Sequence, residues 1–178
     1  MKKSLTTLAV TLLATGAALA QTPDTLKKIK DTGTIVMGVR ESSGLSYTVG
    51  GNKFAGFHVE LCENVLKDVQ KSLGLAKLDV QYHAVSSQNR IPLIQNGTVD
   101  MECGSTTNNA ARAQQVGFAI TTYVEEVRML VKASSGINSI SDLVGKTVAT
   151  TTGTTSVQTL RKHERANGVD FKEVFGKD

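Results

Sequence analysis

The sequence of 178 residues predicts an α/β fold with an open and largely parallel β-sheet. Short β-branched segments alternate along the chain with segments whose apolar residues recur at helical spacing, and this alternation is typical of consecutive βαβ units. In addition, segments rich in arginine, serine and threonine follow four of the expected strands. Ligand-binding residues of parallel sheets occupy this position, at the carboxyl ends of the strands.

The first part of the chain predicts a regular alternation of helices and strands. Gly33 and Gly74 each follow an amphipathic segment and would end a helix, because glycine tolerates the left-handed conformation of a C-cap. Asn89 would cap a later helix that has Pro92 in its first turn, where the missing N–H costs nothing, and Gly97 as its terminator. The expected elements are a helix at 25–30, a strand at 35–39, a loop or irregular hairpin at 44–56, a helix at 59–73, a strand at 78–85, a helix after 89 and a strand at 99–103.

The second part of the chain predicts shorter elements. Residues 104–108 form a polar turn, because Gly, Ser and Asn favour turn conformations. β-branched residues again mark strands, and helical spacing marks the segments between them. The expected elements are a brief helix at 110–115, a strand at 124–131, a short helix at 139–144, a strand at 146–150, a helix at 155–166 and a strand at 169–175.

Residues 1–20 have the three-part layout of a cleavable secretory signal peptide. Lys2 and Lys3 precede an apolar run over 5–17, and a small-x-small triplet ends at Ala20. The apolar run is shorter than the roughly 20 residues that a transmembrane helix needs. We therefore expect cleavage after Ala20 and export of the remaining chain across the inner membrane.

The charge of the chain argues against a nucleic-acid partner. The formal net charge is +4, and removal of Lys2 and Lys3 with the signal peptide lowers it to about +2. This excess is small, and the sequence contains neither a run of basic residues nor an aromatic platform. We expect no nucleic acid among the partners of the protein.

The two cysteines, Cys62 and Cys103, leave two alternatives open. Export to an oxidising compartment permits a disulfide between them. However, Cys62 falls on the apolar side of an expected helix and Cys103 ends an expected strand, so two buried free thiols are equally consistent. Without a CxxC spacing, the pair forms neither a redox motif nor a metal site.

Cofactor and catalytic motifs are absent from the sequence. His58, His83 and His163 lie far apart, with no spacing typical of a metal site. No GxSxG motif occurs, and the threonine-rich run at 150–155 lacks the Gly-Lys-Ser/Thr ending of a P-loop. We expect no metal, no cofactor and no enzymatic activity.

Three arginines, Arg40, Arg90 and Arg112, stand out among the polar segments that follow the strands. A planar guanidinium donates two parallel hydrogen bonds to a carboxylate, and helix N-termini also favour anions. Each arginine alone is more typical of a solvated surface, and serine and threonine are ordinary turn and cap residues. The shared placement after strands nevertheless indicates a site with two positive centres, which would suit a dicarboxylate ligand.

Four segments resemble the solute-binding proteins of polar amino acid ABC transporters (solute-binding protein family 3), and in particular the members that bind glutamate and aspartate. The segments are Gly-Val-Arg-Glu-Ser-Ser at 38–43, Ser-Ser-Gln-Asn-Arg-Ile-Pro-Leu at 86–93, Glu-Cys-Gly-Ser-Thr-Thr-Asn-Asn at 102–109 and Thr-Gly-Thr-Thr-Ser at 152–156. The resemblance implies a two-lobed, hinged, periplasmic-binding-protein-like (type II) fold. It also implies a periplasmic, monomeric receptor that closes on its ligand and presents it to an inner-membrane permease.

The resemblance further implies a role for each candidate ligand-binding residue. Arg112 matches the arginine that grips the α-carboxylate of the ligand, a few residues past the Ser-Thr-Thr turn. The other matching positions are Arg40, Ser87 and Arg90 for the side-chain carboxylate, Ser105 and Thr107 for contacts of the turn, and Thr151 and Thr154 for the second lobe, which closes over the α-carboxylate side.

The resemblance predicts lobe 1 at 21–126, without its C-terminal return segment, and the start of lobe 2 at 127–178. Family members continue beyond the position of Asp178, and a histidine and an acid expected at the ligand belong to that continuation. The expectation is therefore a truncated chain with exposed apolar sheet surface and weak or absent ligand binding. Periplasmic dehydratases that act on cyclic amino-acid precursors share the fold, so an enzyme and a non-functional fragment remain the alternatives to a receptor.

Overall fold

The computed structural model describes residues 24–41 and 43–176, so the expected signal peptide lies outside the described residues. The helices are α1 (Thr25–Thr32), α2 (Phe57–Ser72), α3 (Arg90–Gln95), α4 (Ala110–Ala113) and α5 (Thr155–Asn167), with short 3-10 helices η1 (Ala133–Ser135) and η2 (Ile140–Leu143). The strands are β1 (Thr34–Val39), β2 (Tyr47–Gly50), β3 (Lys53–Ala55), β4 (Asp79–Ala84), β5 (Met101–Cys103), β6 (Thr147–Thr151) and β7 (Lys172–Gly176).

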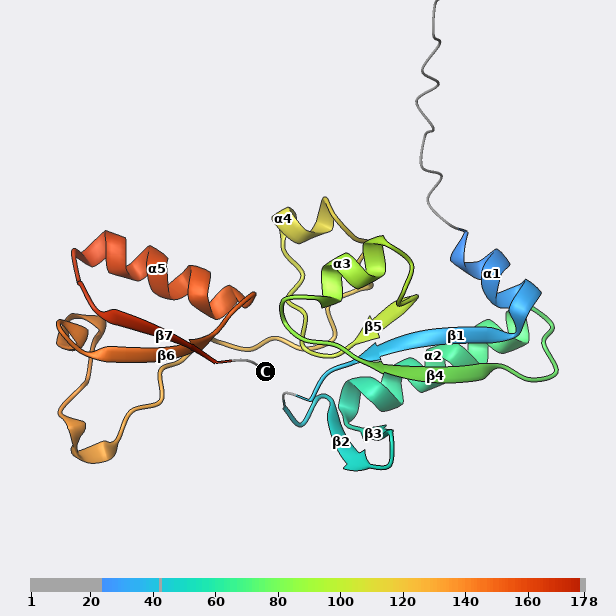
Figure 1. Cartoon of the computed structure of the whole chain (residues 1–178), viewed down its shortest axis with the longest axis horizontal. Helices are drawn as coiled ribbons and strands as arrows, with labels where there is room; N and C mark the ends of the chain where they lie inside the picture. The colour runs from blue at the N-terminus through green and yellow to red at the C-terminus, as the bar shows by residue number, and fades with distance from the viewer. Residues whose placement is uncertain (1–23, 42, 177–178) are drawn as a thin grey trace, which may run out of the picture.

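Two parallel sheets organise the described chain (Figure 1). The first body, residues 24–116, carries a sheet of order β4-β1-β5, and the second body, residues 133–176, carries the pair β6-β7. All pairings within these two sheets are parallel, which confirms the predicted α/β class. In the first body α2 lies on one side of the sheet and α3 and α4 on the other, while α5 lies along β6 and β7 (Figure 1).

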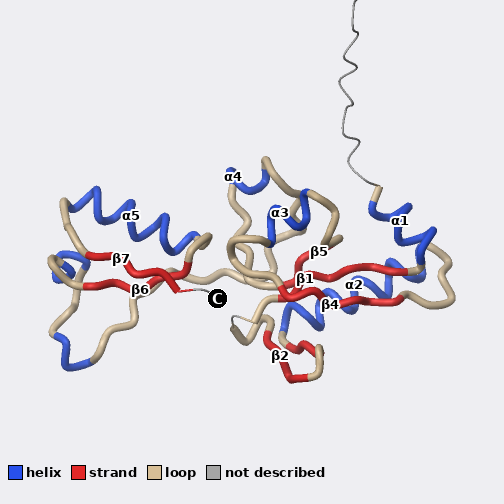
Figure 2. The backbone as a smooth tube through the Cα atoms, viewed as in Figure 1, coloured by secondary structure: helices blue, strands red, loops and turns tan. Residues whose placement is uncertain are grey.

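The segment 117–132 joins the two bodies as irregular chain (Figure 2). The strand predicted at 124–131 is wrong, since the structure assigns no strand there and Val124 and Leu130 are 85% and 101% exposed. The preference of β-branched residues for strands reflects packing and pairing with neighbours more than the backbone itself. In the described residues no strand pairs with this segment, so its composition alone does not produce a strand.

The predicted helix ends are mostly confirmed. Gly33 ends α1 with a φ of 66°, in the left-handed region that favours glycine. Asp24 caps the start of α1, where its Oδ1 accepts a hydrogen bond of 3.0 Å from the amide of Lys27. Asn89 does precede α3, but its side chain does not cap that helix and instead accepts a hydrogen bond of 2.7 Å from the amide of Ser86.

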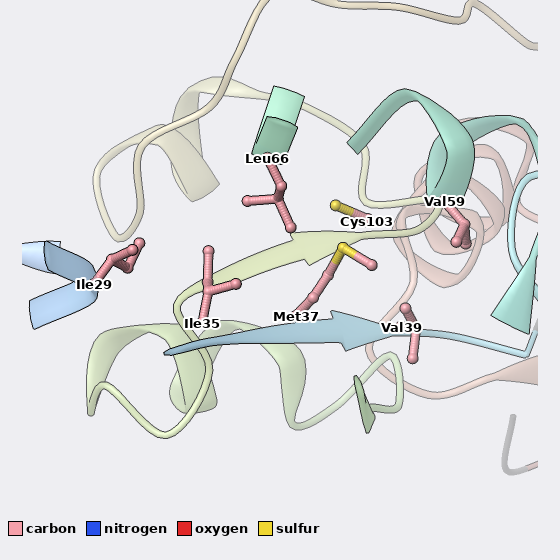
Figure 3. Close-up of a cluster of buried hydrophobic side chains, with 7 residues drawn as sticks. All are labelled: Ile29, Ile35, Met37, Val39, Val59, Leu66 and Cys103. Atoms are coloured by element: carbon pink, nitrogen blue, oxygen red, sulfur yellow. The ribbon is translucent and has the colours of Figure 1, made fainter. Parts of the chain in front are cut away.

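The core of the first body lies between β1 and α2 (Figure 3). Ile35, Met37 and Val39 alternate along β1 and therefore share one face of the sheet. Figure 3 shows Ile35 and Met37 pointing toward Leu66 of α2, and both are buried together with Val59. This apolar layer holds the parallel strands in register and leaves their carboxyl ends at one edge.

The two cysteines form a disulfide that links α2 to the end of β5, with the Cα atoms of Cys62 and Cys103 6.3 Å apart. Of the two alternatives left open by the sequence, the structure therefore has the bridge. Cys103 is almost fully buried and directly precedes the polar turn at 104–108. The covalent link thus anchors one end of that turn to the opposite layer of the first body.

The second body has a smaller core of Leu143, Leu160, Val169 and Phe171. Val169 and Phe171 belong to this core but precede β7, which begins at Lys172 rather than at residue 169. The helix expected at 139–144 is a single 3-10 turn, η2. Val174 and Phe175 in β7 are exposed, as expected for an incompletely covered sheet. No helix in the described ranges is long and apolar enough to cross a membrane.

An ion pair between a half-buried lysine and a buried carboxylate fastens α1 to the sheet and provides a first testable prediction. Asp100, whose side chain is 4% exposed, accepts hydrogen bonds of 2.8 and 2.9 Å from Nζ of Lys28 and one of 2.9 Å from the amide of Val36. Asp100→Ala is expected to lower the free energy of unfolding by about 1 to 3 kcal/mol, because a strand amide and a lysine lose their partner. Urea unfolding followed by circular dichroism measures this change.

The exposed ion pair of Lys27 and Asp31 on α1 serves as the matched control. An i,i+4 pair in water contributes little to stability, so Asp31→Ala should leave the unfolding midpoint unchanged. Equal effects of the Asp100 and Asp31 substitutions would contradict the structural role given to Asp100.

Candidate functional site

The carboxyl ends of β1, β4 and β5 lie at one edge of the first sheet, because the three strands run parallel. Arg40 follows β1 directly and its side chain is 7% exposed. Its Nη1 donates a hydrogen bond of 2.9 Å to Oγ of Ser105, which belongs to the turn after β5. The amide of Arg40 donates to Oγ of Ser46, a fully buried side chain. These contacts place two of the predicted site residues side by side.

The segment after β4 brings Ser87 and Arg90 to the same edge. Both side chains are buried, and that of Arg90 is only 3% exposed. A tight turn precedes them, in which the amide of Asn89 donates to Oγ of Ser86 and the amide of Arg90 to the carbonyl of Ser86. This turn places Arg90 at the first position of α3, where helix amides and the guanidinium both favour a negative charge.

Arg112 connects the two bodies. Its Nη1 donates a hydrogen bond of 3.0 Å to the carbonyl of Thr107, and its Nη2 donates one of 3.1 Å to the carbonyl of Gly153. Asn109 caps α4 by accepting from the amide of Arg112, which sets the direction of the side chain. Burial lowers the pKa of Arg112, the nearby Arg40 lowers it further, and Glu102 opposes both effects. An arginine nevertheless keeps its charge in proteins.

The second body contributes the turn between β6 and α5. The predicted residues Thr151 and Thr154 contact each other here, with Oγ of Thr154 donating 2.8 Å to the carbonyl of Thr151 and capping α5. The hydroxyl that meets the first body is that of Thr155, whose oxygen lies 3.3 Å from Oγ of Thr107. The sequence did not predict that Thr155 contacts the first body. Threonines occupy positions 150–152, 154 and 155, and this run does not indicate which of the side chains points toward the other body.

Two further residues at this edge were not predicted as site residues. His58 is the second residue of α2 and bridges two segments, with Nδ1 2.6 Å from the carbonyl of Gly104 and Nε2 2.8 Å from the hydroxyl of Thr122. Glu102 in β5 interacts electrostatically with all three arginines of the site. The alternation of side chains along β5 was the pattern that could have identified Glu102, since Cys103 faces α2 and its neighbour must face the other side.

The arrangement suits the capture of an anion more than a chemical reaction. Three buried guanidinium groups surround one sheet edge, and they raise the local concentration of negatively charged ligands. No cluster of three or more His, Cys, Asp or Glu side chains that could hold a metal occurs in the part of the chain described. A separate surface hollow on the second body borders Gly153 and Thr154 but is not lined by Arg40, Arg90 or Arg112.

The bacterial extracellular solute-binding proteins, family 3, match residues 35–175 of the sequence. Because this match spans most of the chain, the chain belongs to that family. The L-glutamate/L-aspartate-binding protein of Pseudomonas aeruginosa is 40% identical over 176 residues, which cover 97% of this chain and 58% of that protein. The glutamate/aspartate import solute-binding protein of Escherichia coli is 39% identical over 178 residues, which cover 96% of this chain and 59% of that protein.

Solved structures agree with the family assignment. An ancestral amino acid-binding protein, described as a precursor of cyclohexadienyl dehydratase, superposes with a TM-score of 0.67 at 22% identity, covering 85% of this chain and 64% of that one. The likeness confirms the type II binding-protein fold that the resemblance implied. The chain spans 58% and 59% of the length of the two curated relatives, which is less than two thirds.

Proposed function

We propose that the chain supplies the anion-binding part of a periplasmic receptor that captures glutamate or aspartate and delivers it to an inner-membrane ABC permease. The observation that carries this proposal is the burial of Arg40, Arg90 and Arg112 behind the carboxyl ends of one parallel sheet. Buried cations are costly unless an opposite charge accompanies them. A ligand with two carboxylates would provide two such charges.

The mutual electrostatics of the arginines support the same proposal. Arg40 lowers the pKa of Arg112, which means that the two cations repel each other across the site. Two carboxylates bound among them, one accepting hydrogen bonds from each guanidinium, would relieve that repulsion. In this proposal Arg112 holds the α-carboxylate with Ser105 and Thr107, and Arg40 and Arg90 hold the side-chain carboxylate with Ser87. Thr151 and Thr154 would approach from the second body.

The names of the relatives support the acidic amino acids as ligands. Both curated relatives described above are named for binding glutamate and aspartate. The four segments that resemble that subgroup, which include Arg40, Arg90, Ser105 and Thr154, occur in this chain in the expected order. Export and docking to a permease are inferred from the same family membership.

The test compares each acid with its amide of nearly the same shape. L-glutamate, L-aspartate, L-glutamine and L-asparagine are titrated by isothermal calorimetry into the chain produced without residues 1–20. The acids are expected to bind at least about 10-fold more tightly than the amides, because hydrogen bonds to a charged acceptor contribute roughly 1.5 to 3 kcal/mol. Equal affinities for the acids and for their amides would refute the proposal.

An enzyme on the same fold is the second candidate function. The ancestral structure described as a dehydratase precursor favours it only through the fold, since its identity to this chain is 22%. The turn residues of this site offer hydroxyl groups, and both ring nitrogens of the nearby His58 already lie within hydrogen-bond distance of protein oxygens. Turnover of prephenate or arogenate by the purified chain, followed by ultraviolet absorbance, would establish the enzyme in place of the receptor.

A further inference from the structure

Glu102 is an acid at the centre of a cationic site. It lies in β5, where it pairs with Gly38 of β1. Side chains alternate along a strand, and Cys103 is bound to α2, so Glu102 lies on the opposite face of the sheet, the side of α3. No role in ligand contact is assigned to this carboxyl group in the proposal above.

The carboxyl group of Glu102 folds back beneath the turn that contains Ser105. A Cβ placed on Gly104 would lie 2.4 Å from Oε1 of Glu102 and 3.3 Å from Cβ of Arg40. The glycine therefore leaves the space that the carboxyl group occupies. Oε1 is buried from solvent and accepts no hydrogen bond from the residues that the structure describes, so neither water nor a donor among them stabilises a negative charge on this oxygen.

The charged groups that act on Glu102 come from four elements, and all of them are basic. Arg90 belongs to α3, Arg40 follows β1, His58 lies in the first turn of α2 and Arg112 lies in α4. Burial nevertheless raises the pKa of Glu102 and outweighs the lowering by the Thr106 hydroxyl and by the cations. Because these contributions oppose each other, an additional charge close to Glu102 would change the pKa of its carboxyl group.

We infer that Glu102 is the internal counter-charge of the arginine site and that it takes up a proton from solvent when an anion occupies the site. The inference rests on the proposed function, because it requires an anionic ligand among the same arginines. The physical reason is that two negative groups close together in a buried site cannot both remain ionised at low cost. The arginines do not change their protonation state, because a guanidinium keeps its proton in proteins. The group whose protonation changes is therefore Glu102.

The experiment follows the side-chain carboxyl carbon of Glu102 by nuclear magnetic resonance in the full chain. The resonance is assigned by its loss in Glu102→Gln, and it is titrated with pH in the absence of ligand, with L-glutamate and with succinate. Glu102 is expected to titrate above the ordinary glutamate range in the free chain and at still higher pH with either dicarboxylate. Glu60→Gln, which alters an exposed carboxyl on α2, is the matched control and should leave the Glu102 titration unchanged.

The outcomes separate this inference from the proposed function. A Glu102 resonance that titrates in the ordinary range, or that neither dicarboxylate moves, overturns the inference. Calorimetric binding of L-glutamate without any movement of this resonance leaves the proposed function standing and overturns the inference alone. A shift with succinate but none with L-glutamate supports the counter-charge and counts against an amino acid as the ligand.

Calorimetry provides the second readout. Between about pH 5.5 and 7.5, where free glutamate keeps its own ionisation, ligand binding is expected to weaken with rising pH by at most about 10-fold per unit, as for the uptake of one proton. Glu102→Gln should abolish this pH dependence. His58→Gln distinguishes the neighbouring imidazole, since a dependence that persists in Glu102→Gln and disappears in His58→Gln would overturn the inference.

Discussion

Replacement of Arg112 by methionine is expected to weaken the binding of L-glutamate by about 2 to 5 kcal/mol, which corresponds to at least roughly 30-fold in the dissociation constant. The side chain is buried and donates to the carbonyl of Thr107 and, across to the second body, to that of Gly153. Methionine fills similar space but offers neither the charge nor the fork. Isothermal calorimetry measures the loss of affinity. Arg112→Lys keeps the charge but not the two parallel donors, so its affinity should lie between those of the unmodified chain and of Arg112→Met.

Arg128 offers the matched control for this substitution. It is an exposed arginine in the irregular segment 117–132 and pairs with Glu126 two residues away. Arg128→Met removes the same charge from the chain without touching the sheet edge, so ligand binding should remain as before. If Arg128→Met and Arg112→Met weaken binding equally, the effect comes from net charge and the assigned role of Arg112 is wrong.

Removal of the disulfide is expected to lower the free energy of unfolding by about 2 to 4 kcal/mol. Cys62 and Cys103 are 41 residues apart in the sequence, and the bridge restricts the unfolded chain over that whole length. Replacing both by alanine removes the link while keeping small apolar side chains in the core. Urea unfolding under oxidising conditions measures the difference between the double variant and the unmodified chain.

Chemical reduction provides an independent control for the disulfide. Dithiothreitol should shift the unfolding midpoint of the unmodified chain to that of the double alanine variant and leave the variant itself unchanged. A midpoint that reduction does not alter would show that the bridge contributes nothing to stability. Since Cys103 directly precedes the turn at 104–108, reduction should also weaken L-glutamate binding if the turn depends on this anchor.

Local patterns were sufficient to predict most of the elements of the fold. The helical spacing from Val59 to Leu73 predicts α2 because one face of that helix must meet the sheet, and the structure buries Val59 and Leu66 there. The parallel class follows from the alternation of elements and in turn brings the carboxyl ends of β1, β4 and β5 together. For this reason the sequence predicts Arg40, Ser87, Arg90 and Ser105 at one edge of the sheet.

Features that depend on distant partners were not predictable in the same way. The pairing of Cys62 with Cys103 depends on how α2 lies against β5, which neither local segment determines. The prediction of a strand at 124–131 was wrong because a strand also requires a neighbouring strand for its backbone hydrogen bonds. Glu102 was missed since its importance comes from the convergence of four separate elements around one carboxyl group.

Gly153 allows the two bodies to approach each other closely. Its φ is 79°, and a Cβ built on it would lie 2.7 Å from the carbonyl oxygen of Ser87, which is closer than any real side chain tolerates. A methyl group at position 153 would therefore keep the turn between β6 and α5 away from the backbone of Ser87. The close approach of the turn at 152–154 to the Ser87 backbone therefore depends on a residue without a side chain, and even alanine at position 153 would force the two bodies apart at this point.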